Sequence, residues 1–266
     1  MIKLSNQIKN IRKIIEGARK SIRVNFLIAG TQKGGTTALD FYLRKHPKIC
    51  MAKEKEVHFF DNERIFRMNS FKYAYYHSNF QPNSDNEIIG ESTPVYMYWR
   101  TAPQRIWKYN PNIKIIIILR NPIERAFSHW NMNKQKNHEK LSFHNAILKE
   151  RERCRERLPY QHRKFSYIDR GFYTNQIRTF WDFFPRQQML IIKNEELKYN
   201  SHKTLNKIAR FLNIDEFPKF SIESKHSRKY NNKISKTDKD RLKNIYEFEI
   251  RNLERLLGWD CNDWIA

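Results

Sequence analysis

Cysteine is scarce in this 266-residue chain, and long apolar runs are absent. Cys50, Cys154 and Cys261 lie far apart with no C-x-x-C spacing, which argues against a structural zinc site and against a disulfide framework. We therefore expect a reducing, cytoplasmic environment. No continuous hydrophobic segment has the length of a signal peptide core or a transmembrane span. No spacing typical of metal ligands is visible, so we expect no metal site.

Acidic residues are few relative to basic ones. The chain has 51 lysines and arginines but 28 aspartates and glutamates, which gives a formal net charge of +23. This excess favours anionic partners such as nucleotides, acidic or sulfated glycans, nucleic acids or an anionic membrane surface, although a general lysine-rich composition explains part of it. The basic residues are spread along the chain without a nucleic-acid-binding motif, so we do not expect nucleic acid as a partner.

Residues 1–22 have a pattern of their own. Isoleucines and a leucine recur at helical spacing among lysines and arginines, which predicts an amphipathic basic helix. We expect it to pack against a single domain formed by residues 23–266, and peripheral contact with a membrane is the alternative.

Short apolar runs alternate with helical patterns, which is typical of an α/β fold with a mostly parallel sheet covered on both faces. The predicted strands are Val24–Ala29, Glu87–Gly90, Lys114–Leu119 and Gln188–Ile192. The predicted helices are Thr36–His46, most of Asn131–Phe165, Tyr173–Phe183, His202–Leu212 and Asp238–Leu257, with a loop over Phe220–Ile234. Ligands of such sheets bind beyond the carboxyl ends of the strands.

Three of only seven glycines fall within six residues, between the first predicted strand and the first predicted helix. Gly30, Gly34 and Gly35 allow the backbone to approach an anion closely, and the start of the helix presents N–H groups to it. Lys33 adds a cation. A Walker A loop has its lysine after the last glycine, whereas Lys33 precedes Gly34 and Gly35. The loop therefore predicts phosphate binding, but not of the kind found in ATPases and kinases.

A second anion site is predicted where the third strand ends. Arg120 follows that strand, and Asn121, Pro122 and Glu124 have the spacing of a capped helix start. Ser128 lies two turns into this helix and can face the same sheet edge. An arginine and a hydroxyl suit a second phosphate. The alternative is an arginine paired with a carboxylate and a serine packed inside the protein.

A charged run that ends in an aromatic pair predicts a general base. Glu56 and His58 are two residues apart, so in extended backbone they would share a side, and Phe59 and Phe60 follow. Partial desolvation would raise the pKa of the carboxyl towards neutrality. The alternative is a solvated charge run that ends at a core aromatic pair.

Six motifs between Phe26 and Asp260 resemble the sulfotransferases that use 3′-phosphoadenosine 5′-phosphosulfate (PAPS), in particular the heparan-sulfate branch and its bacterial relatives. They are FLIAGTQKGGTTAL, HPKICMAKEKEVHFFD, GESTPVY, IIIILRNPIERAFSHW, RGFYTNQIRTFWDFFP and ERLLGWD. The resemblance implies a P-loop NTPase-like three-layer α/β/α fold. It also implies PAPS as the donor, released as 3′-phosphoadenosine 5′-phosphate (PAP).

The resemblance assigns roles to individual residues. It places the 3′-phosphate on Arg120 and Ser128, the general base at Glu56, and an auxiliary function at His58. The residues implied to hold the 5′-phosphosulfate are Lys33, Gly34, Gly35, Thr36 and Thr37. Lys33 is then also catalytic, because it stabilises charge on the leaving phosphate oxygen.

The GESTPVY segment departs from the heparan 3-O-sulfotransferases, which have a lysine where this chain has Ser92. The same acceptor is therefore not implied. We expect Glu91, Ser92 and Tyr96, together with Thr93 and Pro94, to shape the acceptor cleft. The alternative is a proline-bearing turn after a strand.

Two further regions match the family. Lys225 and Arg228 lie in a late basic loop and are expected to contact the 3′-phosphate, although a solvated loop is the alternative. Tyr173 is expected to line the nucleotide cleft, and Gln176 to support its helix.

These observations predict transfer of a sulfuryl group from PAPS to a hydroxyl or amine of a small-molecule or glycan acceptor by in-line displacement. Two alternatives belong to other classes: a small-molecule kinase that uses ATP, and a non-catalytic protein that binds polyanions. The position of Lys33 argues against the first. The combination of Lys33, Glu56, Arg120 and Ser128 argues against the second.

Overall fold

The computed structural model describes residues 22–67, 72–218 and 233–265. Its elements are β1 (Phe26–Gly30), α2 (Thr36–Leu43), β2 (Ile49–Met51), α3 (Glu63–Phe66), α4 (Lys72–His77), β3 (Ile88–Ser92), α5 (Ala102–Tyr109), β4 (Lys114–Leu119), α6 (Pro122–Gln135), α7 (Phe143–Leu148), α8 (Glu150–Arg155), η1 (Asp169–Gly171), α9 (Tyr173–Trp181), η2 (Arg186–Gln188), β5 (Met189–Lys193), α10 (Asn194–Tyr199), α11 (Ser201–Leu212), α12 (Lys236–Leu257) and α13 (Asn262–Ile265). The predicted N-terminal helix and the late basic loop with Lys225 and Arg228 lie outside the described residues.

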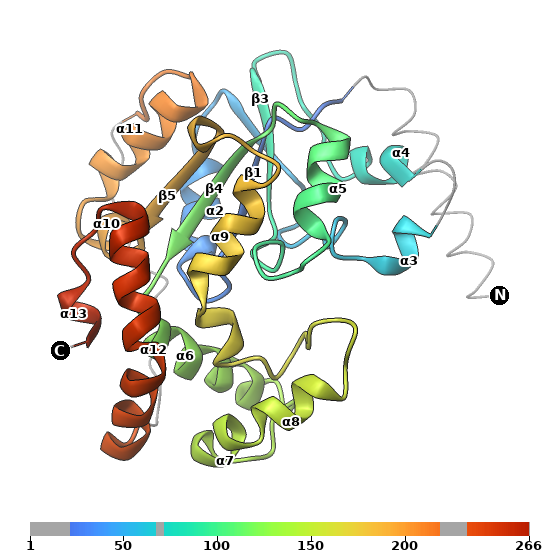
Figure 1. Ribbon diagram of the computed structural model, residues 1–266. Coiled ribbons are helices and arrows are strands. Elements are labelled where there is room, and N and C mark those ends of the chain that lie inside the picture. Colours follow the sequence, from blue (N-terminus) through green and yellow to red (C-terminus); the bar gives the residue numbers. More distant parts are fainter. Residues whose placement is uncertain (1–21, 68–71, 219–232, 266) are drawn as a thin grey trace.

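The strands form one parallel sheet with the order β2-β3-β1-β4-β5, as predicted for the fold class (Figure 1). Four strands fall on the predicted runs. Of these, β4 has the predicted bounds, and the ends of β1, β3 and β5 are shifted by one or two residues. The fifth, β2, is a three-residue strand just before the charged run. Because β1 has β3 on one side and β4 on the other, the loops that follow these three strands meet at one edge of the sheet.

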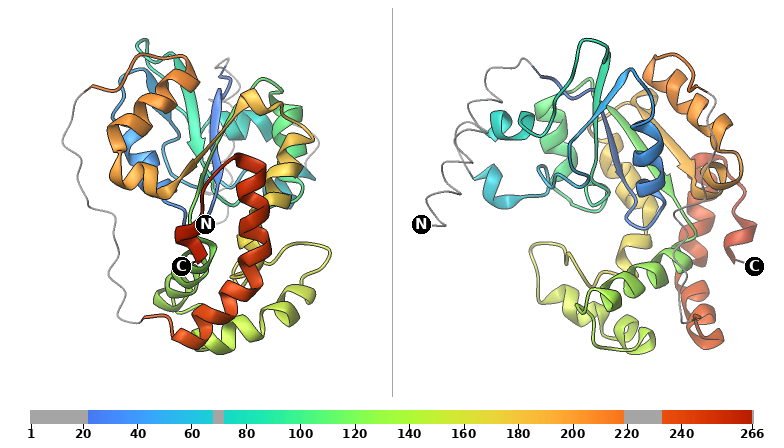
Figure 2. Two further views of the ribbon diagram at one scale, coloured as in Figure 1. Left: turned by 60° about the vertical axis from the view of Figure 1, so that its left-hand side comes forward. Right: turned by 180° about the vertical axis from the view of Figure 1, so that it is seen from behind.

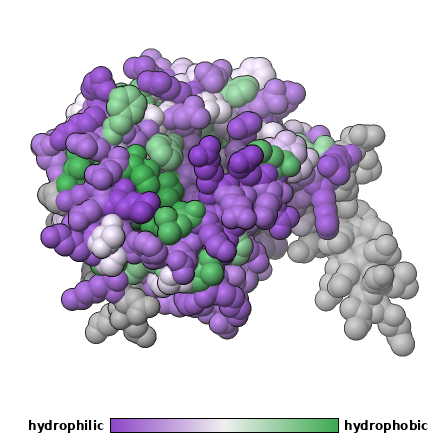
Figure 3. All heavy atoms as spheres, turned by 60° about the horizontal axis from the view of Figure 1, so that its bottom comes forward, coloured by the Kyte–Doolittle hydropathy of each residue, from purple (hydrophilic) through white to green (hydrophobic). Residues whose placement is uncertain are grey.

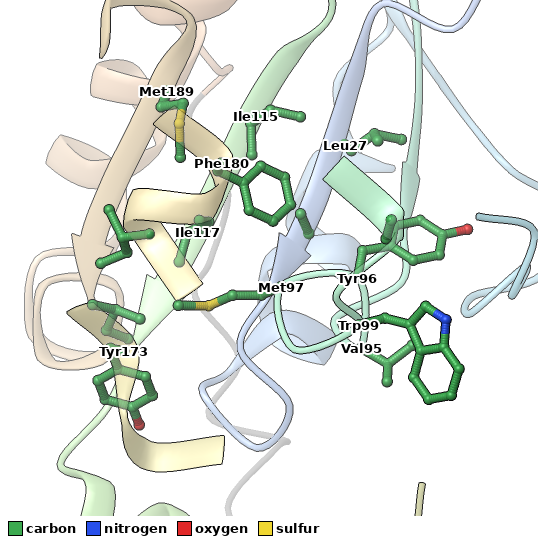
Figure 4. Close-up of a cluster of buried hydrophobic side chains, with 14 of the residues drawn as sticks. Leu27, Val95, Tyr96, Met97, Trp99, Ile115, Ile117, Tyr173, Phe180 and Met189 are labelled. Atoms are coloured by element: carbon green, nitrogen blue, oxygen red, sulfur yellow. The ribbon is translucent and has the colours of Figure 1, made fainter. Parts of the chain in front are cut away.

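The two faces of the sheet pack against different helices, since successive strand residues point to opposite faces. Ile116 and Ile118 contact the core beneath α2 and α11, whereas Ile115 and Ile117 contact the core beneath α5, α9 and α12. Figure 2 shows α2 and α11 on the face turned away in Figure 1. Figure 4 shows the core beneath α5, α9 and α12, in which Phe180 of α9 packs over the sheet beside Met97.

The segment 131–165 is less helical than predicted. The helix α6 ends at Gln135, two short helices follow, and α8 ends at Arg155. Asn137 adopts a left-handed conformation with φ of 56°, which cannot continue a helix, and Pro159 removes a backbone donor from the next segment. Residues 156–165 therefore form an irregular segment beside α8 (Figure 1).

Among the described residues, no helix combines the length and the apolar character that crossing a bilayer would require. The face of the molecule on the side of α7 and α8 is mostly hydrophilic, with one group of hydrophobic side chains exposed in it (Figure 3).

Candidate active site

The loop between β1 and α2 has the close backbone packing that its glycines predict. A Cβ atom on Gly34 would lie 2.4 Å from the carbonyl oxygen of Ile118, and Gly35 has φ of 110° where it caps α2. The Nδ2 atom of Asn194 donates to the Gly34 carbonyl at 2.7 Å. Lys33 adopts φ of 70° in the middle of the loop. The first N–H groups of α2, on Thr36 and Thr37, have no partner within the helix and are available to an anion.

The second predicted anion site lies directly beside this loop. The Thr31 amide donates to the Ile118 carbonyl at 2.9 Å, two residues before Arg120. The Asn121 side chain caps α6, as predicted, by accepting from the Ile123 amide at 2.9 Å. Ser128, two turns along α6, is 1% exposed. The two sites therefore share one edge of the sheet.

Arg120 is engaged by a carboxylate in this structure. Its guanidinium lies 2.6 Å from Glu124, which therefore pairs with Arg120 instead of completing a capping box. The Glu124 side chain is 58% exposed. Exposed pairs of this kind contribute only about 0–1 kcal/mol, so an incoming anion can displace Glu124 at little cost.

Tyr173 supports the same strand end from within the core. It is fully buried, and its hydroxyl donates to the Arg120 carbonyl at 2.8 Å. Packing of α9 on the sheet takes the ring inside, and the expected contact of Tyr173 with a nucleotide stays a prediction. Gln176 supports its helix as predicted, by donating to the Phe172 carbonyl at 2.8 Å.

The charged run before the aromatic pair folds into a cluster of side chains, which we call the carboxylate–histidine cluster: Lys55, Glu56, His58, Asp61 and Arg163. Glu56 lies 2.6 Å from the Lys55 ammonium and 3.6 Å from His58 Nε2. His58 Nδ1 lies 2.9 Å from Asp61, which is fully buried and also accepts from Arg163. The imidazole thus lies between two carboxylates.

The backbone of this cluster is not extended, contrary to the sequence prediction. Glu56 and His58 have φ of 64° and 53°, and their side chains meet through this turn rather than by alternation along a strand. The described residues include five non-glycine residues with positive φ, and three of them, Lys33, Glu56 and His58, lie at the predicted site. Left-handed conformations of bulky residues cost of order 1–3 kcal/mol and are found preferentially at functional sites.

The charges of the cluster reverse the expected shift of the Glu56 pKa. The hydrogen bond with His58, opposed by desolvation and reinforced by Lys55, lowers the pKa of Glu56 to about 2. Hydrogen bonds to Asp61 and then Glu56 raise the pKa of His58 to about 9. The expectation of a carboxyl with a raised pKa is therefore wrong. At neutral pH the cluster contains two carboxylates and an imidazolium.

Glu91, Ser92 and Tyr96 are buried rather than exposed to a cleft. The Glu91 carboxyl accepts from the hydroxyls of Tyr76 and Tyr96 at 2.8 and 2.9 Å, and burial raises its pKa to about 7. The Tyr96 hydroxyl also accepts from the Phe59 amide at 3.0 Å. Tyr96, held by Glu91, therefore fixes the loop that carries His58, and a role of these side chains towards an acceptor stays a prediction.

The cluster follows β2 and the glycine loop follows β1, and β3 lies between these two strands in the sheet. The Glu56 amide donates to the Ser92 carbonyl at 2.9 Å, and Ser92 of β3 lies opposite Ile28 of β1 in the sheet. The glycine loop thus has Glu56 on its β3 side and Arg120 on its β4 side.

Several residues that hold the site together were missed by the sequence analysis. Arg170 is buried, and its guanidinium donates to Gln32 beside Lys33 at 2.6 Å and to the Arg163 carbonyl at 2.8 Å. Asp61 lies within a quoted motif, and its spacing from His58 was a usable signal. Arg163 and Asn194 are 102 and 160 residues distant from their partners, and no local pattern indicates them. Within the described residues, no group of three or more metal-binding side chains is found.

The chain is similar to known sulfotransferases. A profile described as the sulfotransferase domain matches residues 23–252. Human heparan sulfate glucosamine 3-O-sulfotransferase 6 is 31% identical over 188 residues, which is 71% of this chain and 52% of that protein. The membrane-associated sulfotransferase kil1 of Dictyostelium discoideum is 35% identical over 112 residues, 42% of this chain and 23% of that protein. The chain thus spans about half of the first relative and a quarter of the second.

A solved structure covers nearly the whole chain. The sulfotransferase from Alicyclobacillus acidocaldarius superposes with a TM-score of 0.78 at 27% identity, over 92% of this chain and 100% of that one. The likeness confirms the P-loop NTPase-like α/β/α fold. The match of the domain profile to most of the chain decides its family. The chain belongs to the sulfotransferase domain family.

Proposed function

We propose that this protein transfers a sulfuryl group from PAPS to a hydroxyl or amine of a small-molecule or glycan acceptor. The observation that carries the proposal is the position of the glycine loop between Arg120 on one side and Glu56 on the other. A donor with anionic groups at two positions and an acceptor that needs a base both find suitable residues there.

The described residues fit a nucleotide with two separate anionic ends. The glycine loop, with Lys33 and the start of α2, would hold the 5′-phosphosulfate, because Gly34 leaves the backbone free of side-chain obstruction. Arg120 and the buried Ser128 would hold the 3′-phosphate after Glu124 is displaced. Neither anion requires a metal ion in this arrangement.

We assign to Glu56 the role of accepting the proton of the acceptor. Its pKa of about 2 keeps it ionised at neutral pH, and its side chain is 39% exposed. As the acceptor oxygen or nitrogen forms its bond to sulfur, its proton passes to Glu56. The bond between sulfur and the phosphate oxygen breaks, and the electron pair leaves with PAP. Lys33 and the loop amides stabilise the charge on that leaving oxygen.

His58 and Lys55 set the strength of this base. Both hydrogen-bond to Glu56 and lower its pKa. Displacement of Lys55 by the acceptor removes one of these contacts and makes the carboxylate more basic when the acceptor is in place.

The test is calorimetric titration with PAP and with ADP, on the wild type and on R120A. We expect PAP to bind more tightly than ADP, and R120A to weaken PAP binding by about 10–100-fold through loss of a charged contact. R210A is the control, because Arg210 is also an arginine paired with a glutamate, Glu216. Equal affinity for PAP and ADP would contradict the proposal and favour the kinase or polyanion-binding alternative.

The role of Glu56 is tested separately with E56Q and labelled PAPS. We expect transfer to fall by at least about 100-fold while PAP affinity stays within about twofold of the wild type. Loss of PAP binding in E56Q would show that Glu56 belongs to the donor site instead.

A further inference from the structure

A cavity of about 380 Å³ lies between α8, the irregular segment 156–165 and the loop after β3. We call it the α8 cavity. Its volume is in the range of small-molecule sites, about 300–1,000 Å³. It involves none of the residues so far assigned to the donor or to the base.

The wall of the α8 cavity is largely apolar. Ile147, Leu158 and Phe172 contribute aliphatic and aromatic surface, and Tyr98 and Tyr160 contribute rings. Leu158 and Tyr160 are 68% and 41% exposed, although both are large hydrophobic side chains. Exposed apolar side chains gathered at a cavity are typical of a binding site.

The polar groups deeper in the cavity are already engaged. Glu150 is 4% exposed, and its carboxylate accepts from the Ile168 and Asp169 amides at 2.7–2.8 Å. Asp169 accepts from the Tyr98 hydroxyl at 2.6 Å. Burial raises the pKa of Cys154 to about 12, so its thiol is not a nucleophile at neutral pH.

Three arginines give the cavity a positive rim. Arg100, Arg151 and Arg155 line it and are exposed. They outnumber the two carboxylates that line it, which are both engaged by hydrogen bonds. An apolar wall with a cationic rim suits a ligand that has an apolar body and an anionic group.

Two chains of contacts join this cavity to the site. The Tyr98 ring lies 4.5 Å from the guanidinium of Arg170, which binds Gln32 beside Lys33. The Tyr160 ring stacks on Trp99 at 6.4 Å, and the Arg163 guanidinium lies 4.3 Å from the Trp99 ring. Tyr98 and Arg170 thus connect the cavity to the donor loop, and Tyr160, Trp99 and Arg163 connect it to the carboxylate–histidine cluster.

We propose that the α8 cavity is an acceptor subsite for a small molecule with an apolar aryl or alkyl body and a carboxylate or phosphate group. The apolar body lies against Tyr98, Leu158 and Tyr160, and the anionic group pairs with the rim arginines. This inference rests on the proposed sulfuryl transfer and selects the small-molecule class over a glycan, which has no apolar aryl or alkyl body to cover the apolar wall.

The site itself is tested without catalysis. The probe is 8-anilinonaphthalene-1-sulfonate, followed by its fluorescence, beside N-phenyl-1-naphthylamine, which lacks the sulfonate. We expect saturable binding of both to the full chain. The double variant R151A/R155A should weaken binding of the sulfonate about tenfold and leave the neutral probe unchanged. R157A is the matched control, because Arg157 is exposed on the same segment but does not line the cavity. Equal effects of R157A and R151A/R155A would overturn the inference.

The role as acceptor subsite is tested with labelled PAPS and a series of 4-hydroxyphenyl alkanoates, each beside its neutral amide. We expect the carboxylates to have kcat/KM values about tenfold above those of the amides, and R151A/R155A to remove that difference. Equal rates for acids and amides, or no transfer to either while PAP binds normally, would overturn the inference. Failure of PAP to bind the wild type would instead contradict the proposed function.

Discussion

The strongest prediction about the carboxylate–histidine cluster concerns Asp61. Replacing this residue in D61N keeps the shape of the side chain and removes its charge. Asp61 is the largest cause of the raised pKa of His58, through a 2.9 Å contact. We therefore expect the pKa of His58 to fall in D61N, and the pKa of Glu56 to rise because its main hydrogen-bond partner loses charge.

The size of the effect follows from the geometry. A rise of the His58 pKa from 6.5 to about 9 corresponds to about 3 kcal/mol in favour of the imidazolium. The His58 side chain is 44% exposed, so solvent screening reduces this to roughly 1.5 kcal/mol. Loss of the Asp61 charge should remove most of that, which lowers the pKa of His58 by about one unit.

The pH dependence of the free energy of unfolding of the wild type should reflect the same interaction of His58 with Asp61. Because the folded pKa of His58 lies above its unfolded value, the contribution is complete below pH 6.5 and is lost as the pH rises through about 9. D61N should reduce this part of the pH dependence of the free energy of unfolding.

The assay is NMR titration of the His58 ring, assigned by comparison with H58Q, in the wild type, D61N and R163Q. R163Q is the control that removes the other partner of Asp61 and keeps the carboxylate; there the pKa of His58 should stay high. A wild-type value near 6.5, or a value in D61N within about 0.3 of the wild type, would refute the reasoning.

Two other predictions concern the packing of the site. G34A should weaken PAP binding at least about tenfold and destabilise the fold by about 1–3 kcal/mol, measured by calorimetry and urea unfolding, because its Cβ would lie 2.4 Å from the Ile118 carbonyl; wild-type affinity would contradict the close backbone packing. Glu91 has its folded pKa raised to about 7, so its contribution to stability is present below pH 4.5 and is lost, by up to about 3 kcal/mol, as the pH rises through 7. Urea unfolding of E91Q across this range should give a shallower decline than the wild type, and parallel curves would contradict the burial of an ionisable carboxyl.

The parts of the site that the sequence predicts are those built from continuous backbone. The glycine loop follows a buried strand, and the Asn121 cap and Ser128 follow another, so local spacing places both at the ends of parallel strands. The glycine spacing alone predicted the loop, although the distant Asn194 also holds it through the Gly34 carbonyl. Local propensity and the hydrophobic pattern were sufficient there.

The parts that the sequence does not predict depend on distant partners. The pKa of Glu56 was expected to rise because burial was visible in the aromatic neighbours, but the imidazolium that lowers it is fixed by Asp61 and Arg163. The alternation of side chains along an extended strand likewise cannot predict the left-handed backbone at Glu56 and His58. Tyr173 was placed on the correct helix, yet only the packing of α9 shows that it faces the core.

The two halves of the site therefore differ in how they are built, and the difference has a consequence for specificity. In the proposed function the donor half consists of backbone and strand ends, whereas the acceptor half takes Arg163 and part of the wall of the α8 cavity from one irregular segment. A substitution that reshapes this segment to fit another acceptor also moves the guanidinium that holds Asp61, and through it the charge of His58. Under the proposed function, acceptor choice and the strength of the base are thus coupled through residues 156–165. Arg170 extends the coupling to the donor loop, because it donates to both the Arg163 carbonyl and Gln32.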